Sequence, residues 1–272
     1  MKKTVLVMTG GGAKAFIHLG VFDVLKENGV RIDHIVSTSS GSLVAVFASS
    51  GLSFNKIKKR MLKYNQRISW FLPSIKEFGY FSQMPFRSLL NKLVKEKKIE
   101  ELPIPVTIVA SNITKLKSHI ITKGSISDAV CAASAYPFIY KPKELKGNYI
   151  VDGGILNSEP ADVAKKISKG AIVITVSLTS PFDRSKYTPN SRLETAFRCL
   201  FYHSEMSRRK NADKYSDLII YPLKHLFYSL KTWKSIFEFY SSKKIIEYYS
   251  LGRKEALGNL DKIRKLIKEK RY

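Results

Sequence analysis

A serine-rich segment near the N-terminus, residues 37–41, has the residue types of a hydrolase nucleophile. It stands where an expected strand gives way to an expected helix of small residues, and a nucleophile elbow places its serine on such a strained turn. Ser39 has small residues two positions before and two positions after it, Ser37 and Gly41. A frame on Ser40 has a bulkier second flank and no glycine. Ser39 is therefore the better candidate nucleophile, and a serine-rich helix cap is the alternative.

Three consecutive glycines, Gly10, Gly11 and Gly12, follow an expected strand and precede an expected helix. Glycines in this place let the backbone turn tightly and aim N–H groups at an anion, assisted by the helix N-terminus. The anion can be a dinucleotide phosphate, a nucleotide phosphate or a tetrahedral oxyanion. A dinucleotide site needs a carboxylate at the end of the second strand, and residues 36–39 contain none. The Gly-Lys-Ser/Thr sequence of a Walker A loop is also missing. The glycines alone therefore do not identify the anion, and the motifs that lie near them must do so.

An aspartate followed by two glycines, Asp152-Gly153-Gly154, comes directly after a short run that is expected to be a strand, residues 148–151. A carboxylate at the end of a strand, with glycines behind it, can approach a serine closely and serve as a general base. The alternative is a β-turn, for which Asp-Gly is a common signal.

Together, these three motifs resemble the patatin-like phospholipase family. That family has a glycine-rich oxyanion loop, a G-x-S-x-G elbow and a D-G-G/A aspartate, in this order along the chain. The resemblance covers roughly residues 4–180 of this sequence. Further matches are His18, Gly20, Val21, residues 133–138, Asn157 and Pro160.

The sequence departs from the family pattern at three positions. Ser37 replaces the first glycine of the elbow and adds a hydroxymethyl group at a tight position. Ala15 replaces the glycine after Lys14, and Thr9 stands where many members have Asp or Asn. Ser37 is the main support for an alternative, a noncatalytic relative that has kept the fold.

The resemblance implies a catalytic dyad of Ser39 and Asp152, without a histidine in the relay. Asp152 would take the proton of Ser39 as the serine attacks an ester carbonyl, and would return it to the leaving alcohol. A Ser-Asp-His hydrolase is the alternative, with His203 or His225 as the histidine after the aspartate.

Backbone N–H groups would stabilise the oxyanion in this site, since the glycine loop lies at a helix N-terminus. The implied oxyanion residues are Gly10, Gly11, Gly12 and Ser40. The implied supporting residues are Lys14, Gly41, Gly153 and Gly154. The sequence shows no metal-binding constellation, so we expect no metal and no cofactor.

Short β-rich runs alternate with helical stretches over about residues 1–180, which indicates a mostly parallel sheet covered on both faces. We therefore expect an α/β fold with three layers, α/β/α. The expected strands are residues 3–9, 33–38, 106–111 and 171–177, and the expected helices are residues 15–28, 41–50, 127–135 and 161–168. Residues 1–272 are expected to form a single domain. Its catalytic core covers about 4–180, and a helical part rich in aromatic and basic residues covers about 181–272.

The chain has 272 residues, with 47 Lys and Arg against 22 Asp and Glu, and a formal net charge of +25. This charge predicts attraction to a polyanion, either an anionic membrane surface or nucleic acid. Basic clusters such as residues 56–60 are also typical of solvated helix faces. The sequence has neither zinc-finger spacing nor an RNP-type motif, so nucleic acid is not the expected partner.

Two segments, residues 70–86 and 218–249, are rich in aromatic residues and suit either a membrane interface or a core. No run reaches the roughly 18–20 apolar residues that span a bilayer, and the apolar start is too short for a signal peptide. The two cysteines, Cys131 and Cys199, exclude a disulfide framework. These features predict a cytoplasmic protein, with peripheral action at the inner membrane face as a further expectation.

The leading hypothesis is a carboxylic-ester hydrolase that uses its serine to cleave a lipid ester, either a phospholipid or a lysophospholipid. A small-ester or thioester hydrolase at the same site is the second hypothesis. The others are a noncatalytic relative that binds anionic membranes and a nucleic-acid binder. The expected partners are thus a lipid ester substrate and an anionic membrane surface, with no prediction for the oligomeric state.

Overall fold

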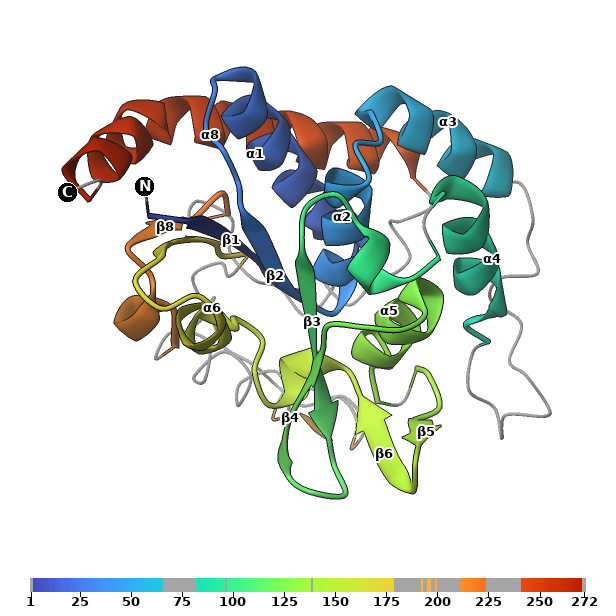
Figure 1. Ribbon diagram of the computed structural model, residues 1–272. Helices are drawn as coiled ribbons and strands as arrows, with labels where there is room; N and C mark the ends of the chain where they lie inside the picture. Colours follow the sequence, from blue (N-terminus) through green and yellow to red (C-terminus); the bar gives the residue numbers. More distant parts are fainter. Residues whose placement is uncertain are drawn as a thin grey trace.

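The computed structural model of the chain describes residues 2–65, 82–95, 97–137, 139–178, 211–223 and 241–270, with a few single positions between 192 and 199. These residues form one mixed sheet with helices on both faces (Figure 1). The predicted three-layer α/β fold is confirmed.

The sheet has eight strands and a parallel centre. The strands are β1 (Thr4–Met8), β2 (His34–Thr38), β3 (Val106–Asn112), β4 (Lys117–Ile121), β5 (Lys143–Leu145), β6 (Asn148–Val151), β7 (Ile172–Val176) and β8 (Leu218–Ile220). They follow the order β5-β6-β3-β2-β1-β7-β8, and β4 pairs with β3 off this path. The strands from β3 to β8 in this order run parallel, whereas β4, β5 and β6 make antiparallel pairs.

Helices cover the sheet on both sides. The helices are α1 (Phe16–Glu27), α2 (Ser40–Ser49), α3 (Phe54–Asn65), α4 (Met84–Leu93), α5 (Ile126–Ala133), α6 (Ala161–Ile167) and α8 (Ser242–Glu269), and 3-10 turns occur at Gly12–Ala15, Ile99–Glu101 and Gly153–Ile155. Figure 1 shows α1, α2 and the long α8 on one face of the sheet and α6 on the other.

The alternation of side chains along β1 builds both layers of the core. Leu6 and Met8 belong to the larger hydrophobic cluster, which includes the buried residues of α1 and α2. Val5 and Val7 belong to the second cluster, together with Ala161 and other residues of α6. Because both faces are covered, the whole of β1 is buried, as is typical of a central parallel strand.

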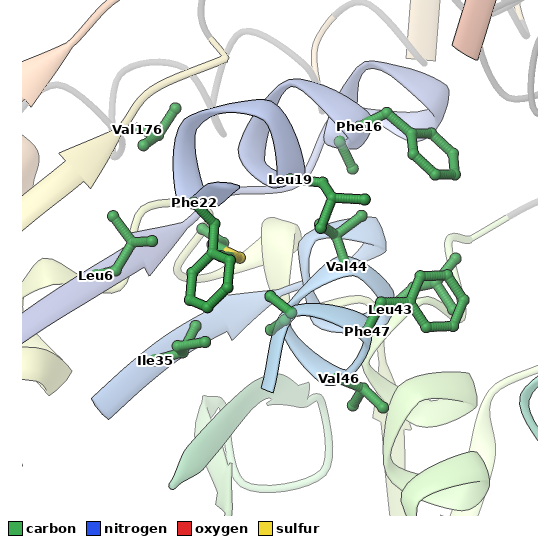
Figure 2. Packing of buried hydrophobic residues seen from close by; sticks show 14 of the residues in the cluster. Leu6, Phe16, Leu19, Phe22, Ile35, Leu43, Val44, Val46, Phe47 and Val176 are labelled. Atoms are coloured by element: carbon green, nitrogen blue, oxygen red, sulfur yellow. The ribbon is translucent and has the colours of Figure 1, made fainter. Parts of the chain in front are cut away.

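The first helix packs both on the sheet and under α8. Figure 2 shows Leu19 and Phe22 of α1 among the buried apolar side chains that line this layer. On the side that faces α8, a Cβ atom added at Gly20 would lie 2.1 Å from the carbonyl oxygen of Tyr249. A Cβ at Gly252 would lie 2.0 Å from the carbonyl oxygen of Ile17. Two glycines therefore permit the close approach of these helices.

The predicted elements of the first 180 residues are present, with ends that shift by a few residues. The helix expected from residue 15 begins instead as the 3-10 turn Gly12–Ala15 and continues as α1. Pro160, matched after the aspartate motif, is the N-cap of α6. The stretch expected to be helical beyond residue 180 contains α8 but also the strand β8, whose three residues are too few to show an alternating pattern.

Most of the aromatic residues noted in the sequence lie outside the described residues. This is true of Trp70 and its aromatic neighbours up to Phe81, and of the aromatic residues from Phe227 to Tyr240. Tyr248 and Tyr249 are described. Tyr248 is buried in the hydrophobic core, and Tyr249 is partly buried and packs against that core.

Candidate active site

Ser39 lies on a strained turn at the carboxyl edge of the parallel strands. It follows β2 directly and is the N-cap of α2, with φ 50° and ψ −137°. Few residues other than glycine adopt such a positive φ, so the surrounding structure must hold the strain. The side chain is half-buried and remains partly open to solvent. This is the geometry of a nucleophile elbow.

The two flanks of the elbow differ in how much space they have. A Cβ at Gly41 would lie 2.5 Å from the carbonyl oxygens of both Met8 and Thr9, so only glycine fits there. Ser37 lies within β2, and its Oγ donates a hydrogen bond of 3.4 Å to the carbonyl oxygen of Thr107. The hydroxymethyl group that replaces the family's glycine is therefore accommodated inside the sheet.

Asp152 lies next to Ser39, although 113 residues separate them. The Oγ of Ser39 donates a 2.6 Å hydrogen bond to Oδ2 of Asp152. The other carboxylate oxygen, Oδ1, accepts the N–H of Gly154 at 2.7 Å. The aspartate itself is only 2 % exposed. One oxygen is thus held by the backbone, while the other faces the serine.

The antiparallel strand β6 delivers the aspartate to this place. Val151, the last residue of β6, pairs with Ser111 near the end of β3. Asp152 then caps the 3-10 turn Gly153–Ile155, which passes over the neighbouring strands. A Cβ at Gly153 would lie 2.1 Å from both the Oγ1 of Thr38 and the carbonyl oxygen of Val109. A glycine at this position is therefore required for the carboxylate to reach Ser39.

The glycine loop lies against the elbow. A Cβ at Gly10 would be 2.8 Å from the Cβ of Ser39, so the loop backbone passes directly beside the serine. The N–H of Gly11 donates a 3.1 Å hydrogen bond to the Oγ of Ser40. Gly12 follows with a positive φ of 61°, which suits glycine. Ser40 begins α2, where N–H groups of the first turn have no acceptor within the helix.

Lys14 lies in the 3-10 turn after the glycines and is only 8 % exposed. The resemblance implies a supporting role for this lysine, which a buried position allows. Its burial places it inside the fold, at the base of the glycine loop.

His18 is fully buried and contacts the residue that precedes the glycine loop. Its Nε2 lies 2.8 Å from the carbonyl oxygen of Thr9, which can only accept, so Nε2 carries the proton. Burial lowers the pKa of His18 to about 4, despite this hydrogen bond, and the ring is neutral at pH 7. Thr9 in turn links β1 to β7, because its Oγ1 donates to the carbonyl oxygen of Val176 and accepts the N–H of Leu178, each at 3.2 Å.

The other histidines that the structure describes lie elsewhere. His34 begins β2, at the edge of the sheet opposite Ser39, and its Nε2 contacts the Oγ1 of Thr107 at 2.9 Å. His119 lies on β4 and pairs with Ala110 of β3. His203 and His225, the candidates for a third catalytic residue, lie outside the described residues.

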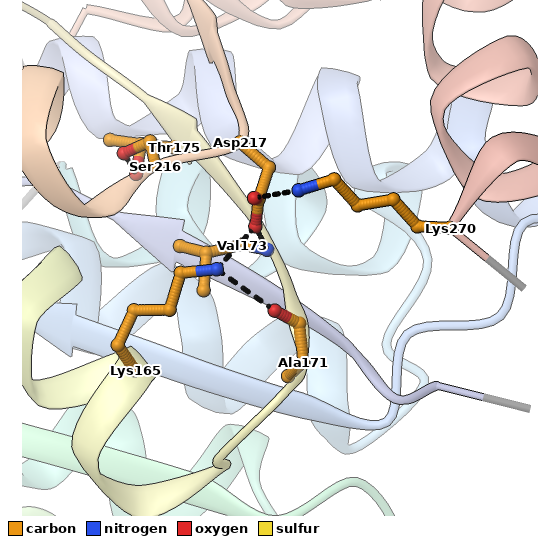
Figure 3. Close-up of polar contacts among 7 residues, drawn as sticks. All are labelled: Lys165, Ala171, Val173, Thr175, Ser216, Asp217 and Lys270. Atoms are coloured by element: carbon orange, nitrogen blue, oxygen red, sulfur yellow. Dashed lines mark hydrogen bonds and ion pairs between the residues drawn. The ribbon is translucent and has the colours of Figure 1, made fainter. Parts of the chain in front are cut away.

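Two carboxylates that pair with residues of other elements were not singled out in the sequence. Glu159 is 1 % exposed and accepts a 2.5 Å hydrogen bond from Ser177 at the end of β7. Asp217 lies just before β8, between the ammonium groups of Lys165 and Lys270 (Figure 3). No local motif marks either carboxylate, since the partners of each come from other elements.

Burial alone would raise the pKa of Asp217. Hydrogen bonds from Lys165, Lys270 and the N–H of Val173 outweigh it, so the pKa is lowered. The Nζ of Lys165 lies 2.6 Å from Oδ2, and the N–H of Val173 lies 2.7 Å from the same oxygen. This cluster ties α6, α8 and β8 together.

Among the described residues, no group of three or more His, Cys, Asp or Glu side chains is placed to hold a metal ion. Within the same residues, no helix is both long enough and apolar enough to span a bilayer.

The molecule thus combines an α/β fold with a serine on a strained elbow and an aspartate in hydrogen-bonding contact with that serine. A family model described as patatin-like phospholipase matches residues 6–165. The chain belongs to the patatin-like phospholipase family, as its motifs predicted.

The curated relatives are longer than this chain. Patatin-like phospholipase domain-containing protein 6 of Mus musculus is 30% identical over 192 residues, which is 67% of this chain and 14% of the relative. An uncharacterized NTE family protein of Mycobacterium tuberculosis is 31% identical over 159 residues, 58% of this chain and 44% of the relative. Among solved structures, VipD from Legionella pneumophila matches with a TM-score of 0.49 and 14% identity, over 96% of this chain and 67% of that one.

Proposed function

We propose that the protein is a serine acyl hydrolase that cleaves lipid esters, either phospholipids or lysophospholipids, with Ser39 and Asp152 as its catalytic dyad. The observation that carries the proposal is the 2.6 Å hydrogen bond between Ser39 Oγ and Asp152 Oδ2 on a strained elbow. Membership of the patatin-like phospholipase family supports a lipid acyl hydrolase.

The first half of the reaction forms an acyl-enzyme. The Oγ of Ser39 attacks the ester carbonyl carbon while its proton passes to Oδ2 of Asp152. The tetrahedral intermediate then collapses, the bond to the alcohol breaks, and Asp152 returns the proton to the leaving alkoxide. The N–H of Gly154 holds Oδ1 throughout, which keeps Oδ2 directed at the serine.

The second half releases the acid. Water attacks the acyl carbon and gives its proton to Asp152, and the collapse of this intermediate returns the proton to Ser39. The reaction consumes one water, forms one carboxylic acid and needs no metal or cofactor.

Backbone N–H groups of Gly10, Gly11, Gly12 and Ser40 form the proposed oxyanion hole. The glycine loop passes beside Ser39, as the 2.8 Å distance of a Gly10 Cβ from the Ser39 Cβ indicates. The N–H of Gly11 donates to Ser40 Oγ at 3.1 Å, which ties the loop to the start of α2, and the oxyanion would share this N–H with the hydroxyl. In a comparable site, loss of one such donor costs about 3–4 kcal/mol of transition-state stabilisation.

A series of p-nitrophenyl esters with increasing acyl length tests the proposal, with EDTA present. We expect rates that rise with acyl length in the wild type and vanish in Ser39→Ala. A matched control is Ser250→Ala, which removes an exposed hydroxyl on α8 and should leave the rates unchanged. Rates that are highest for the shortest esters would favour a small-ester hydrolase. A wild type that is inactive on all esters and on phospholipid vesicles would favour a noncatalytic relative.

A further inference from the structure

The third helix presents a face with charge of one sign. Helix α3 contains several basic residues and no acidic one. Lys56, Lys59 and Arg60 are exposed, and the spacing i, i+3, i+4 places them on one side of the helix. Ile57 and Met61, on the other side, are buried at 0% and 4% exposure. The basic face therefore points away from the core.

None of the acidic residues that the structure describes pairs with the basic residues of this face. Within the described part of the chain, the side chains of Lys56, Lys59 and Arg60 form no ion pair. Their positive charge is therefore available to an external anion.

Helix α3 is fixed on the rest of the molecule. The ring of Phe54 stacks on that of Tyr249 in α8, with centroids 3.7 Å apart and planes at 1°. The ammonium of Lys58 lies 5.8 Å above the Phe54 ring, so this half-buried lysine contributes to the attachment. Figure 1 shows α3 at the periphery of the molecule, beside α8 and α4. A basic face on a fixed peripheral helix requires little ordering when it binds a surface.

The long helix α8 is basic as well, but its charges are mixed. Lys244 pairs with Glu247 at 3.0 Å, and Lys265 pairs with Glu269 at 3.8 Å. Such interleaving of both signs is typical of a solvated helix face. Helix α3 thus carries charge of one sign, whereas α8 carries both signs.

We propose that the face of α3 formed by Lys56, Lys59 and Arg60 docks the protein on an anionic lipid surface. The proposal rests on the proposed function, because the substrate of a phospholipid hydrolase lies in such a surface. Basic side chains gain attraction to anionic lipids within about one Debye length of the membrane. The neighbouring helix α4 starts with Met84, which is 64% exposed and suits insertion between lipids.

The test measures vesicle binding by sedimentation, with Ser39→Ala as the background so that no lipid is consumed. Vesicles of phosphatidylcholine mixed with phosphatidylglycerol are compared with vesicles of phosphatidylcholine alone. Binding of the Ser39→Ala protein should be stronger to the mixed vesicles and should be lost at about 1 M salt, where the Debye length is about 3 Å. Each basic side chain is expected to contribute roughly fivefold to the affinity.

Charge-reversal variants distinguish the effect of the α3 face on binding from the effect of the protein's net charge. The variant Lys56→Glu, Lys59→Glu, Arg60→Glu should bind mixed vesicles more weakly by well over about 100-fold, because each position loses an attraction and gains a repulsion. The matched control Lys254→Glu, Lys262→Glu, Lys268→Glu makes the same change in net charge on exposed positions of α8 and should lose only a few-fold. A milder variant with Gln at the three α3 positions should fall between them, and circular dichroism checks that each variant is folded.

Three outcomes overturn the proposal. They are equal binding to both kinds of vesicle, equal losses in the α3 and α8 variants, and tighter α3-dependent binding to duplex DNA than to mixed vesicles. The ester assays of the wild type are separate from these measurements. An inactive protein that still docks through α3 would therefore contradict the proposed function and leave the docking face in place.

Discussion

Two aspartates at opposite edges of the sheet have the same side chain in different hydrogen-bonding surroundings. Asp152 lies at the carboxyl edge of the parallel strands, with its Oδ2 on the hydroxyl of Ser39 and its Oδ1 on a backbone N–H. Asp217 lies at the amino edge, where the N–H of Val173 and the ammonium groups of Lys165 and Lys270 hold its carboxylate.

The two carboxylates differ in whether they can accept a proton from a neighbouring group. A carboxylate that accepts a hydroxyl proton can take that proton when the oxygen attacks. A carboxylate held by two ammonium groups has a lowered pKa and is a poor base, so its contribution is to stability. In open α/β sheets, ligands bind at the carboxyl ends of the strands, which is the edge where Asp152 lies.

The largest expected effect comes from Asp152→Asn. The amide cannot accept the serine proton, so kcat should fall on the order of 10³-fold or more. The midpoint of thermal unfolding should stay close to that of the wild type, because the isosteric amide oxygen can still accept the N–H of Gly154. Initial rates on a long-chain p-nitrophenyl ester give the first value and a thermal melt the second. Retention of more than about a tenth of the wild-type kcat would remove Asp152 from the reaction.

A second prediction concerns the space beside the elbow. Gly41→Ala places a methyl group 2.5 Å from two carbonyl oxygens and should lower the free energy of unfolding by roughly 3 kcal/mol. The matched control is Gly258→Ala on α8, where a Cβ meets nothing within 4 Å. That change should stabilise the protein by about 1 kcal/mol, since alanine is a better helix former than glycine. Urea unfolding measures both, and equal effects of the two changes would contradict the tight packing of the elbow.

The third prediction breaks the amino-edge cluster. Asp217→Asn removes the charge between Lys165 and Lys270, which are about 33% and 41% exposed, so solvent already screens the pairs. We expect a loss of about 2 kcal/mol in the free energy of unfolding, with kcat on soluble esters unchanged at a temperature where the protein is folded. A fall in kcat without a loss of stability would reverse the roles given to the two aspartates.

The same variant should alter the acid limb of the stability profile. The pKa of Asp217 is lowered in the folded protein, so its contribution to stability is fully present above the unfolded pKa of about 3.9. That contribution is lost as the pH falls through the lower folded pKa. The wild type should therefore lose stability below about pH 4 more steeply than Asp217→Asn does.

The smallest expected effect concerns the hydrogen bond between the glycine loop and the hydroxyl of Ser40. Ser40→Ala removes the acceptor of the Gly11 N–H, and a single hydrogen bond of this kind contributes about 1 kcal/mol. We expect kcat to fall roughly fivefold with little change in KM, since the loop is less well placed for the oxyanion. Ser42→Ala is the matched control, because the buried Oγ of Ser42 has no hydrogen-bond partner among the described residues. Equal rates in the two variants would show that the Ser40 hydroxyl does not position the loop.

The residues of the candidate site could be proposed from the sequence because its motifs are local. The elbow around Ser39, the glycines before α1 and the Asp-Gly-Gly turn each need particular residues at short spacing. Ser37 shows the limit of such patterns. The sequence marks it only as a departure from glycine, whereas the structure shows its hydroxyl donating to Thr107 across the β2–β3 pair.

The Asp217 cluster could not be predicted in this way. Its partners are far from it in the sequence, Lys165 by 52 residues and Lys270 by 53, and neither spacing has a pattern. In a chain with 47 Lys and Arg, no single lysine stands out as the partner of a given carboxylate. The strand β8 was missed for a related reason, since its three residues join the sheet only through pairing with β7.

The sequence by itself determined the order and kind of the main elements and the residue types that can do chemistry. These depend on hydrophobic periodicity, glycine positions and short motifs, which act over a few neighbouring residues. The tertiary structure alone decided that Ser39 and Asp152 meet at 2.6 Å, that Lys14 is buried, and that α8 lies against α1. Those contacts join residues that are distant in sequence, so they follow from strand order and register, which local patterns do not specify.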